Sequence, residues 1–351
     1  MRTRPLKLGL LVSREGPLGI WAPSCDASAL LAVAELNAAG GLLGQPIELV
    51  VADAGPTHAS AAEGAATLID LDGVAAIVTM VESSARRVLL NRIGGRIPVV
   101  YTPQFEGGET DATALTIGET TAGLVARGLE WLMCHKRATR FYLIGSDYLW
   151  PRRSILLARL QIAARGGSVI GESIVPYGHE NYERVVETIG RARPDVVIFW
   201  LAGHESIMFN RTFAARGLGS KILRFCTAVE ETILYATGPD CTENLFVASS
   251  YFANLRSRNN DAFLERYHQA FGASPPPANG FGQSLYEGVH CLSGLAEAAG
   301  SLRPAELRRR VGQAAQHRTA RGNEPRIAAG RTSHPVHVAV ADECDFRILT
   351  D

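Results

Sequence analysis

The sequence has no surplus of charge of either sign. Thirty-five Lys and Arg residues balance thirty-five Asp and Glu residues, so the formal net charge is zero at pH 7. Proteins that are drawn to nucleic acid or to an anionic membrane by their overall field carry a clear excess of basic residues. The composition therefore argues against such attraction, and we expect no direct nucleic-acid binding.

Long hydrophobic runs are also missing. No stretch approaches the ~20 apolar residues that span a membrane. The chain starts with Met1-Arg-Thr-Arg-Pro5 and continues directly into the apolar run 6–12, which is one strand long and contains Lys7. A secretory signal needs an apolar core of roughly 7–15 residues and then a small-residue cleavage site. We therefore expect a first strand here and a cytoplasmic protein; a periplasmic protein is the alternative if a leader was trimmed and replaced by a new Met.

Cysteine pairs and the common catalytic motifs are absent as well. The six cysteines are scattered, with no CxxC pair and no His/Cys cluster at metal-ligand spacing. Free thiols are therefore favoured over disulfides, and no metal is expected. The sequence has no G-x-S-x-G, H-E-x-x-H or phosphate-loop motif and no dinucleotide fingerprint after the first strand. Ser83 and His204 would make only part of a catalytic triad, so we expect neither an enzyme nor a bound cofactor.

What the sequence does contain is a regular alternation of strand and helix patterns. In the first hundred residues the pattern predicts strands at 6–12, 47–52, 74–79 and 98–101, and helices at 24–39, 60–71 and 83–93. It then predicts helices at 121–134, 151–165, 182–192 and 205–215, and strands at 140–144, 168–175, 195–201 and 221–225. Such alternation with short connections predicts an α/β fold of two doubly wound lobes, each with its own parallel sheet.

The remaining segments complete the two lobes. Helical patterns at 260–271 and 282–299 are assigned to lobe 1, and the strand pair 336–341 and 346–349 to lobe 2. Lobe 1 is then 1–119 plus 250–325, and lobe 2 is 120–249 plus 326–351. Ligands of open α/β sheets bind outside the carboxyl ends of the strands. We therefore expect a ligand cleft between the lobes.

Several motifs carry a family resemblance that spans nearly the whole chain. The segment GLLVSREG at 9–16, the helix end AELNAAGG at 34–41 and LGQPIE at 43–48 resemble the opening of type I substrate-binding proteins. YTPQFEG at 101–107 and GSDYLWPR at 145–152 resemble the branch of that family that binds urea and short-chain amides. The segments 227–231, 250–252 and 299–301 follow at the distances typical of this branch.

The resemblance implies a type I periplasmic-binding-protein fold, with two lobes joined by a multi-strand hinge. It implies reversible binding of a short-chain amide or urea-like ligand by a cytoplasmic sensor, which regulates an amidase-type operon through an antiterminator-type protein. The alternative is the substrate-binding component of an ABC transporter for urea, amides or branched-chain amino acids, with a permease as partner. Either role permits a homodimer.

The same resemblance implies a set of ligand-binding residues at the carboxyl ends of strands. Ser83 begins a helix and would bind a carbonyl or carboxylate, or else act as a plain N-cap. Aromatic rings would sandwich a planar group. The expected ligand-binding residues are Ser83, Tyr101, Pro103, Tyr148, Trp150, Gly203, Thr227 and Glu82.

Two positions near Ser83 depart from the amide- and urea-binding pattern. Relatives have an aromatic residue in the place of Val81 and a neutral side chain in the place of Glu82. The loss of the aromatic ring would enlarge the pocket, and a carboxylate could attract a cationic ligand. We expect Glu82 to face solvent and the ligand to be neutral; a contact between Glu82 and an ammonium group is the alternative. His204 is expected to be a polar loop residue beside Gly203.

Overall fold

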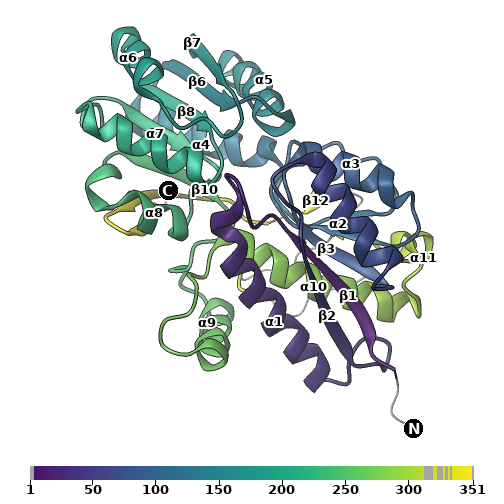
Figure 1. Cartoon of the computed structure of the whole chain (residues 1–351). Coiled ribbons are helices and arrows are strands. Elements are labelled where there is room, and N and C mark those ends of the chain that lie inside the picture. The colour runs from purple at the N-terminus through teal and green to yellow at the C-terminus, as the bar shows by residue number, and fades with distance from the viewer. Residues whose placement is uncertain (1–3, 312–318, 322–326, 329–330, 333, 350–351) are drawn as a thin grey trace. The chain divides into compact units, whose positions relative to one another are not determined.

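The structure is a computed structural model that describes residues 4–311, 319–321, 327–328, 331–332 and 334–349 (Figure 1). The chain divides into two compact units. Unit 1 comprises Met1–Thr120 and Arg256–Pro335, and unit 2 comprises Thr121–Leu255 and Val336–Asp351. The α/β fold with two parallel-sheet units, expected from the sequence, is confirmed. The interlobe cleft and the multi-strand hinge stay predictions.

The unit boundaries differ from those drawn from the sequence at residues 250–255. These residues were assigned to lobe 1, but they belong to unit 2. The backbone N–H of Ala253 donates to Glu231, and the Asn254 amide donates to the backbone carbonyl of Phe346. These hydrogen bonds tie the segment to a helix and a strand of unit 2. The boundary drawn at 325/326 differs as well, because the described residues between 327 and 335 were assigned to lobe 2 but belong to unit 1.

Unit 1 is built on a five-stranded sheet in which the paired strands are all parallel. Its strand order is β2-β1-β3-β4-β5, with β1 at Leu6–Val12, β2 at Ile47–Asp53, β3 at Ala76–Met80, β4 at Val99–Tyr101 and β5 at Ala114–Thr116. All residues of β3 and β4 are buried because helices cover both faces of the sheet.

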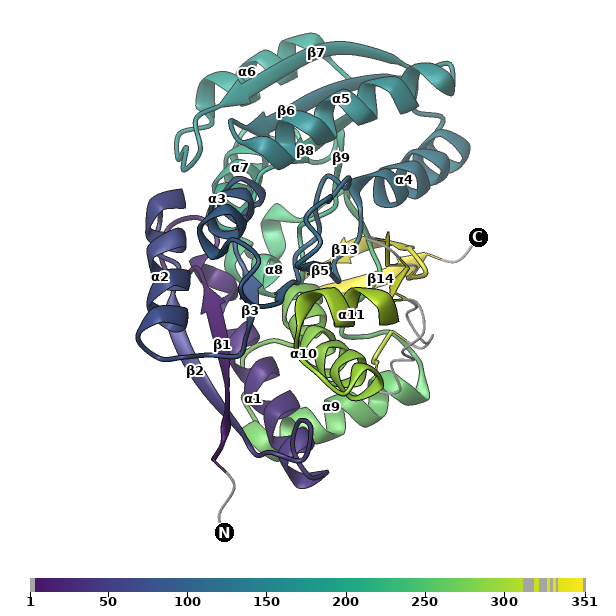
Figure 2. The same ribbon diagram turned by 90° about the vertical axis from the view of Figure 1, so that its right-hand side faces the viewer.

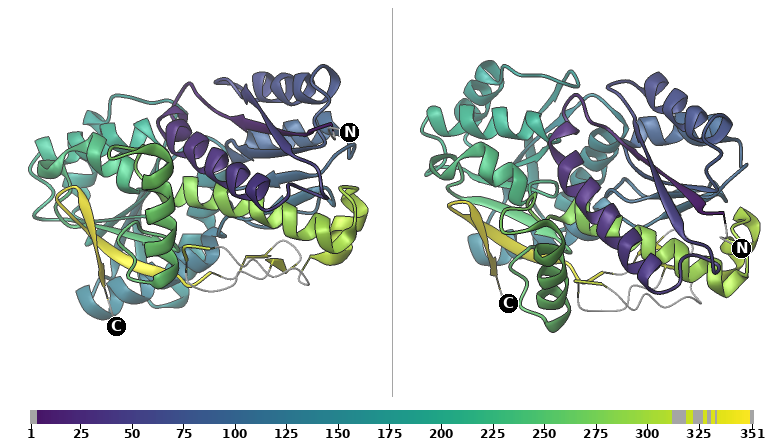
Figure 3. Two further views of the ribbon diagram at one scale, coloured as in Figure 1. Left: turned by 90° about the horizontal axis from the view of Figure 1, so that it is seen from below. Right: turned by 60° about the horizontal axis from the view of Figure 1, so that its bottom comes forward.

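Two pairs of helices cover the faces of this sheet. Figure 2 shows α2 (His58–Asp70) and α3 (Ser83–Ile93) on one face, and α1 (Ala22–Ala38) and α10 (Gly280–Ala299) on the other. In both views of Figure 3, α1 and α10 lie side by side, although they are far apart in the sequence. Unit 1 also contains η1 (Gly19–Trp21), α9 (Arg258–Phe271), α11 (Pro304–Arg310) and a small hairpin of β11 (Ile327–Ala328) and β12 (Arg331–Thr332).

Glu35 links three of these helices, two of which belong to the segment of unit 1 that begins at Arg256. Its carboxylate on α1 accepts from Arg266 of α9 at 2.6 Å and from the Tyr286 hydroxyl of α10 at 2.5 Å. Burial alone would raise the pKa of Glu35, but hydrogen bonds from His290, Tyr286 and Arg266 outweigh it and lower the pKa to about 2. The carboxylate is therefore ionised and fully partnered at neutral pH.

Arg321 anchors a later segment to α10. Its guanidinium is completely buried, and it contacts Glu119 at 3.0 Å and Glu287 at 3.4 Å. The Thr319 hydroxyl also donates to Glu287. A buried charge is tolerated only when it is paired and hydrogen-bonded, which these contacts provide.

Unit 2 contains a seven-stranded sheet with the order β14-β13-β10-β9-β8-β6-β7. Strands β6 (Arg140–Ser146), β7 (Ser168–Val175), β8 (Val196–Trp200), β9 (Leu223–Cys226) and β10 (Leu245–Ser249) are parallel, whereas β13 (His337–Asp342) and β14 (Asp345–Leu349) add an antiparallel edge. The predicted tail strands are thus confirmed in unit 2, where β13 pairs with β10 and β14 pairs with β13.

The helices of unit 2 also form two layers. In Figure 2, α5 (Leu149–Ala164) lies in front of the sheet, and α6 (Glu183–Ala192) and α7 (His204–Ala215) lie behind it. Helix α4 (Thr121–Lys136) packs on β10 and β13, and α8 (Glu231–Thr237) packs beside α7 and is followed by η2 (Pro239–Cys241). No disulfide joins the six cysteines; Cys25, Cys226 and Cys291 are buried, and Cys134 is exposed.

Candidate functional site

The carboxyl ends of β3 and β4 bring Ser83 and Tyr101 to one edge of the unit 1 sheet. Tyr101 is the last residue of β4 and pairs with Thr79 of β3, and Ser83 follows β3 by three residues. Both side chains are buried, and they share a hydrogen bond. Burial raises the pKa of the Tyr101 phenol, and the nearby positive charge of Arg86 opposes this effect. Pro103 is buried in the loop that follows.

Glu82 does not face solvent, so that prediction is wrong. Its side chain is only 8% exposed. It is the N-cap of α3 and accepts from the backbone N–H groups of Ser84 and Ala85 at 2.6 Å each, and His58 lies 2.6 Å from the same carboxylate. The first N–H groups of a helix lack internal partners, and a carboxylate there also meets the positive end of the helix dipole. Ser83, considered above as a plain N-cap, is instead the first residue of the helix.

We expect Glu82→Ala to lower the free energy of unfolding by about 0.5–2 kcal/mol, the usual cost of losing an N-cap side chain. Urea denaturation measures this change. Glu82→Asp keeps a carboxylate at the N-cap and is the control, with a smaller loss. Unchanged stability combined with lost ligand affinity would show that Glu82 contacts the ligand rather than the helix.

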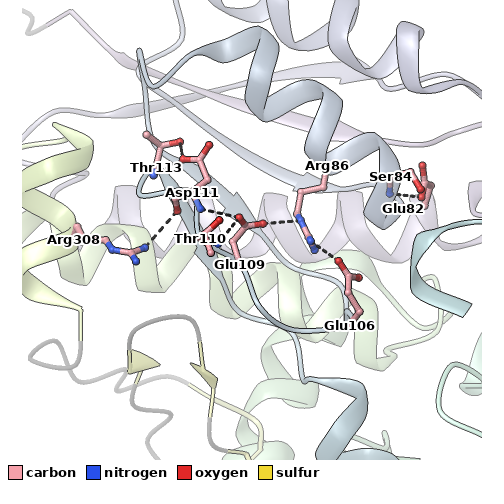
Figure 4. Close-up of polar contacts among 9 residues, drawn as sticks. All are labelled: Glu82, Ser84, Arg86, Glu106, Glu109, Thr110, Asp111, Thr113 and Arg308. Atoms are coloured by element: carbon pink, nitrogen blue, oxygen red, sulfur yellow. Dashed lines mark hydrogen bonds and ion pairs between the residues drawn. The ribbon is translucent and has the colours of Figure 1, made fainter. Parts of the chain in front are cut away.

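Arg86 is a residue of this edge that the sequence interpretation missed. It lies one turn after Ser83 on the buried face of α3, and its side chain is 3% exposed. Figure 4 shows its guanidinium between Glu106 and Glu109, with Nη2 2.6 Å from Glu106 and Nε 2.9 Å from Glu109. The guanidinium also lies over the rings of Tyr101 at 4.6 Å and Phe105 at 5.0 Å.

The electrostatics of Arg86 follow from these neighbours. Burial by itself disfavours the charged guanidinium, but Tyr101, Glu106 and Glu109 outweigh it, and the pKa of Arg86 is raised. The sequence did contain a signal for this residue. Arg86 occupies the same helical stripe as the buried Leu90 and Ile93, where an arginine needs buried partners.

In unit 2, Tyr148 and Trp150 follow β6 and lie in one aromatic group. The ring centroids of Tyr148 are 6.2 Å from Trp150 and 5.1 Å from Tyr177. Tyr148 is half-buried and is the N-cap residue of α5. The structure thus brings two of the predicted ligand residues together on this unit.

Trp150 has a defined place within unit 2. Its side chain is buried, and its indole N–H donates to the Thr121 hydroxyl at 3.0 Å. The same hydroxyl lies 3.1 Å from that of Ser154 on α5. The indole therefore joins the beginning of α4 to α5.

The turn between β8 and α7 contains Gly203, which has φ 54° and ψ −121° at the N-cap of α7. His204 is exposed, but it is the first residue of α7 rather than the loop residue expected from the sequence. Glu205 is buried and accepts from the Ser146 hydroxyl at 2.6 Å and from the Gly178 backbone N–H at 2.7 Å. Burial raises the pKa of Glu205. The carboxylate thereby fastens the ends of β6, β7 and β8 to one another.

Thr227, the last predicted ligand residue, follows β9 directly and is buried. All four predicted residues of unit 2 therefore follow the parallel strands β6, β8 and β9. The predicted residues of unit 1 similarly lie after β3 or at the end of β4. That these residues bind a ligand stays a prediction.

The described residues offer no group of three or more His, Cys, Asp or Glu side chains suited to a metal ion. Within the same residues, none of the helices is long and apolar enough to cross a membrane.

Comparison with known proteins gives one family match and several solved structures of the same fold. A family model described as periplasmic binding protein matches residues 5–345. A solute-binding protein of an R. palustris ABC transporter in complex with benzoate is 17% identical, with a TM-score of 0.85, and the match covers 99% of this chain and 96% of that one. A branched-chain amino acid transporter substrate-binding protein of Streptococcus pneumoniae in complex with isoleucine is 16% identical, with a TM-score of 0.87 and 99% coverage of both chains.

A third similar structure is a leucine-binding protein of Thermotoga maritima. It is 17% identical, has a TM-score of 0.86 and covers 98% of each chain. At these identities the likeness shows a shared fold.

Proposed function

Because the chain belongs to the periplasmic binding protein family, we propose that it binds a small organic solute reversibly, as the substrate-binding component of an ABC transporter. The observation that carries this proposal is the family match over residues 5–345. The similar structures are a solute-binding protein in complex with benzoate, a substrate-binding protein in complex with isoleucine and a leucine-binding protein, which supports the same role. A permease is the protein partner that this role requires.

Residues at the carboxyl ends of the strands of each sheet supply the chemistry for such binding. Ser83 and Tyr101 provide hydroxyl groups at the ends of β3 and β4, and Tyr148 provides an aromatic face after β6. Pockets for small molecules combine apolar and aromatic walls with a few fixed polar groups. The finer part of the proposal is a short-chain amide or urea-like ligand, which rests on the resemblance of residues 101–107 and 145–152 to the amide- and urea-binding branch.

The sensor interpretation has less support than the transporter interpretation. Neither the family match nor the similar structures point to a regulatory partner or to an amidase operon. A transporter role would place the chain outside the cytoplasm, contrary to the location expected from the sequence. Fractionation of cells that express the native gene tests the location directly.

We expect a thermal-shift panel of small amides, ureas, branched-chain amino acids and benzoates to give at least one clear upward shift. A ligand that binds only the folded state stabilises it by about 2.7 kcal/mol at a concentration of 100 Kd. Heat-denatured protein titrated with the same compounds is the control. A flat response across the whole panel would contradict the proposed ligand classes.

A further inference from the structure

The two carboxylates around Arg86 are not equivalent. Glu109 Oε1 accepts from the backbone N–H groups of Thr110 and Asp111 at 2.9 Å each, and its Oε2 lies 2.9 Å from Arg86 Nε. Glu106 uses Oε1 for Arg86 Nη2 at 2.6 Å. Its other oxygen, Oε2, is buried and has no hydrogen-bond partner among the described residues. Glu109 is therefore fully engaged by the protein, whereas Glu106 is not.

Arg86 has a matching unused group. Its Nη1 and Nε are both buried, and neither has a hydrogen-bond partner within the described part of the chain, although Nε forms an ion pair with Glu109. Nε and Nη2 face the two carboxylates, and the Tyr101 and Phe105 rings hold the guanidinium in place. Buried polar groups are normally satisfied, so an unused donor and an unused acceptor on paired side chains call for an explanation.

The charge of the cluster indicates which kind of ligand group could bind to these two unused atoms. One guanidinium stands between two carboxylates, so the formal charge of these three side chains is −1. A carboxylate ligand that accepted from Arg86 would bring a third negative charge to this buried group, which is costly in a medium of low dielectric constant. A neutral group with a carbonyl oxygen next to an N–H could instead accept from Nη1 and donate to Glu106 Oε2.

We propose that Arg86 and Glu106 are specificity-determining residues that select a neutral ligand group, a carbonyl next to an N–H, over a carboxylate. This inference rests on the proposed solute-binding function. It adds a selection rule to that function, namely that an amide binds more tightly than the corresponding carboxylate. Ser83 and Tyr101 belong to the same edge, because Arg86 stacks on Tyr101 and Tyr101 hydrogen-bonds Ser83. The ligand group is thus bound by the end of β4 and the first turn of α3.

The test compares amides with the corresponding carboxylates by calorimetric titration of the full chain. The probes are acetamide and acetate, benzamide and benzoate, and leucinamide and leucine. In wild type, the amide should bind at least tenfold more tightly than its carboxylate in each pair that binds. Glu106→Gln should lower this preference at least tenfold, because the carboxylate no longer meets a second negative charge.

Glu109→Gln is the matched control, since it also removes one carboxylate from Arg86 but leaves Glu106 Oε2 in place. Its amide preference should fall less than that of Glu106→Gln, because the Glu109 carboxylate is already compensated by the backbone N–H groups of Thr110 and Asp111. Equal effects of the two variants, at equal stability in urea, would overturn the proposal and assign the cluster a purely structural role.

The wild-type titrations test the selection rule even if a variant does not fold. Tighter binding of carboxylates than of amides would overturn the selection rule and leave solute binding intact. The absence of binding by these probes and by the whole thermal-shift panel would instead contradict the proposed function together with the selection rule.

Discussion

At pH 8, Glu231→Gln is expected to be more stable than wild type by several kcal/mol, and this difference should disappear near pH 4.5. Glu231 is 4% exposed at the start of α8, and its Oε1 accepts from the Ala253 N–H at 2.6 Å. Burial, reinforced by the negative charge of Glu230, raises the pKa of Glu231 from 4.5 to about 8.

The sign of the pH dependence follows from proton linkage. Between about pH 4.5 and 8 the unfolded chain has released the Glu231 proton while the folded chain still holds it. The free energy of unfolding of wild type therefore falls as pH rises, by at most about 1.4 kcal/mol per pH unit from this group. The glutamine amide resembles the protonated acid, can still accept from the Ala253 N–H, and does not titrate.

Urea denaturation at several pH values measures the effect. Glu187→Gln on α6 is the control, because that carboxylate is about half exposed and its loss should change stability by no more than about 0.5 kcal/mol at any pH. Parallel pH profiles for wild type and Glu231→Gln would show that Glu231 titrates normally in the folded protein.

The α/β order of the fold could be predicted because its central strands are buried on both faces. Strands β3 and β8 consist entirely of buried residues, so each appears in the sequence as a short apolar run that can be recognised as a strand. Several short elements escaped prediction, β5 and α8 among them. Strand β5 has only three residues and α8 has seven, and neither is long enough to show a period.

The candidate site was harder to predict than the fold, since it depends on where charged side chains find partners. The sequence placed Ser83 and Tyr101 at strand ends, which the structure shows. It placed Glu82 in solvent, and no local pattern indicated its capping role, since glutamate is not among the preferred N-cap residues. The engagement of Glu82 by His58 and of Arg86 by Glu106 joins α3 to other segments, and a local pattern does not display such pairs.

Trp150 illustrates how a family motif and a packing role can coincide. The resemblance assigns it to a ligand wall, whereas its indole is 4% exposed and hydrogen-bonded within unit 2 to Thr121. Both roles are compatible with an aromatic residue just after β6. They differ in what happens to the unliganded protein when the ring is removed.

We expect Trp150→Ala to lower the free energy of unfolding by about 3–5 kcal/mol without any ligand, through the cavity that the missing indole leaves. Trp150→Phe keeps most of the ring but loses the donor to Thr121, so it should cost less, about 1–3 kcal/mol. Urea denaturation of the unliganded variants measures both values. If Trp150→Ala kept wild-type stability and lost only the ligand-induced thermal shift, the packing role would be wrong and Trp150 would be a wall of the ligand site.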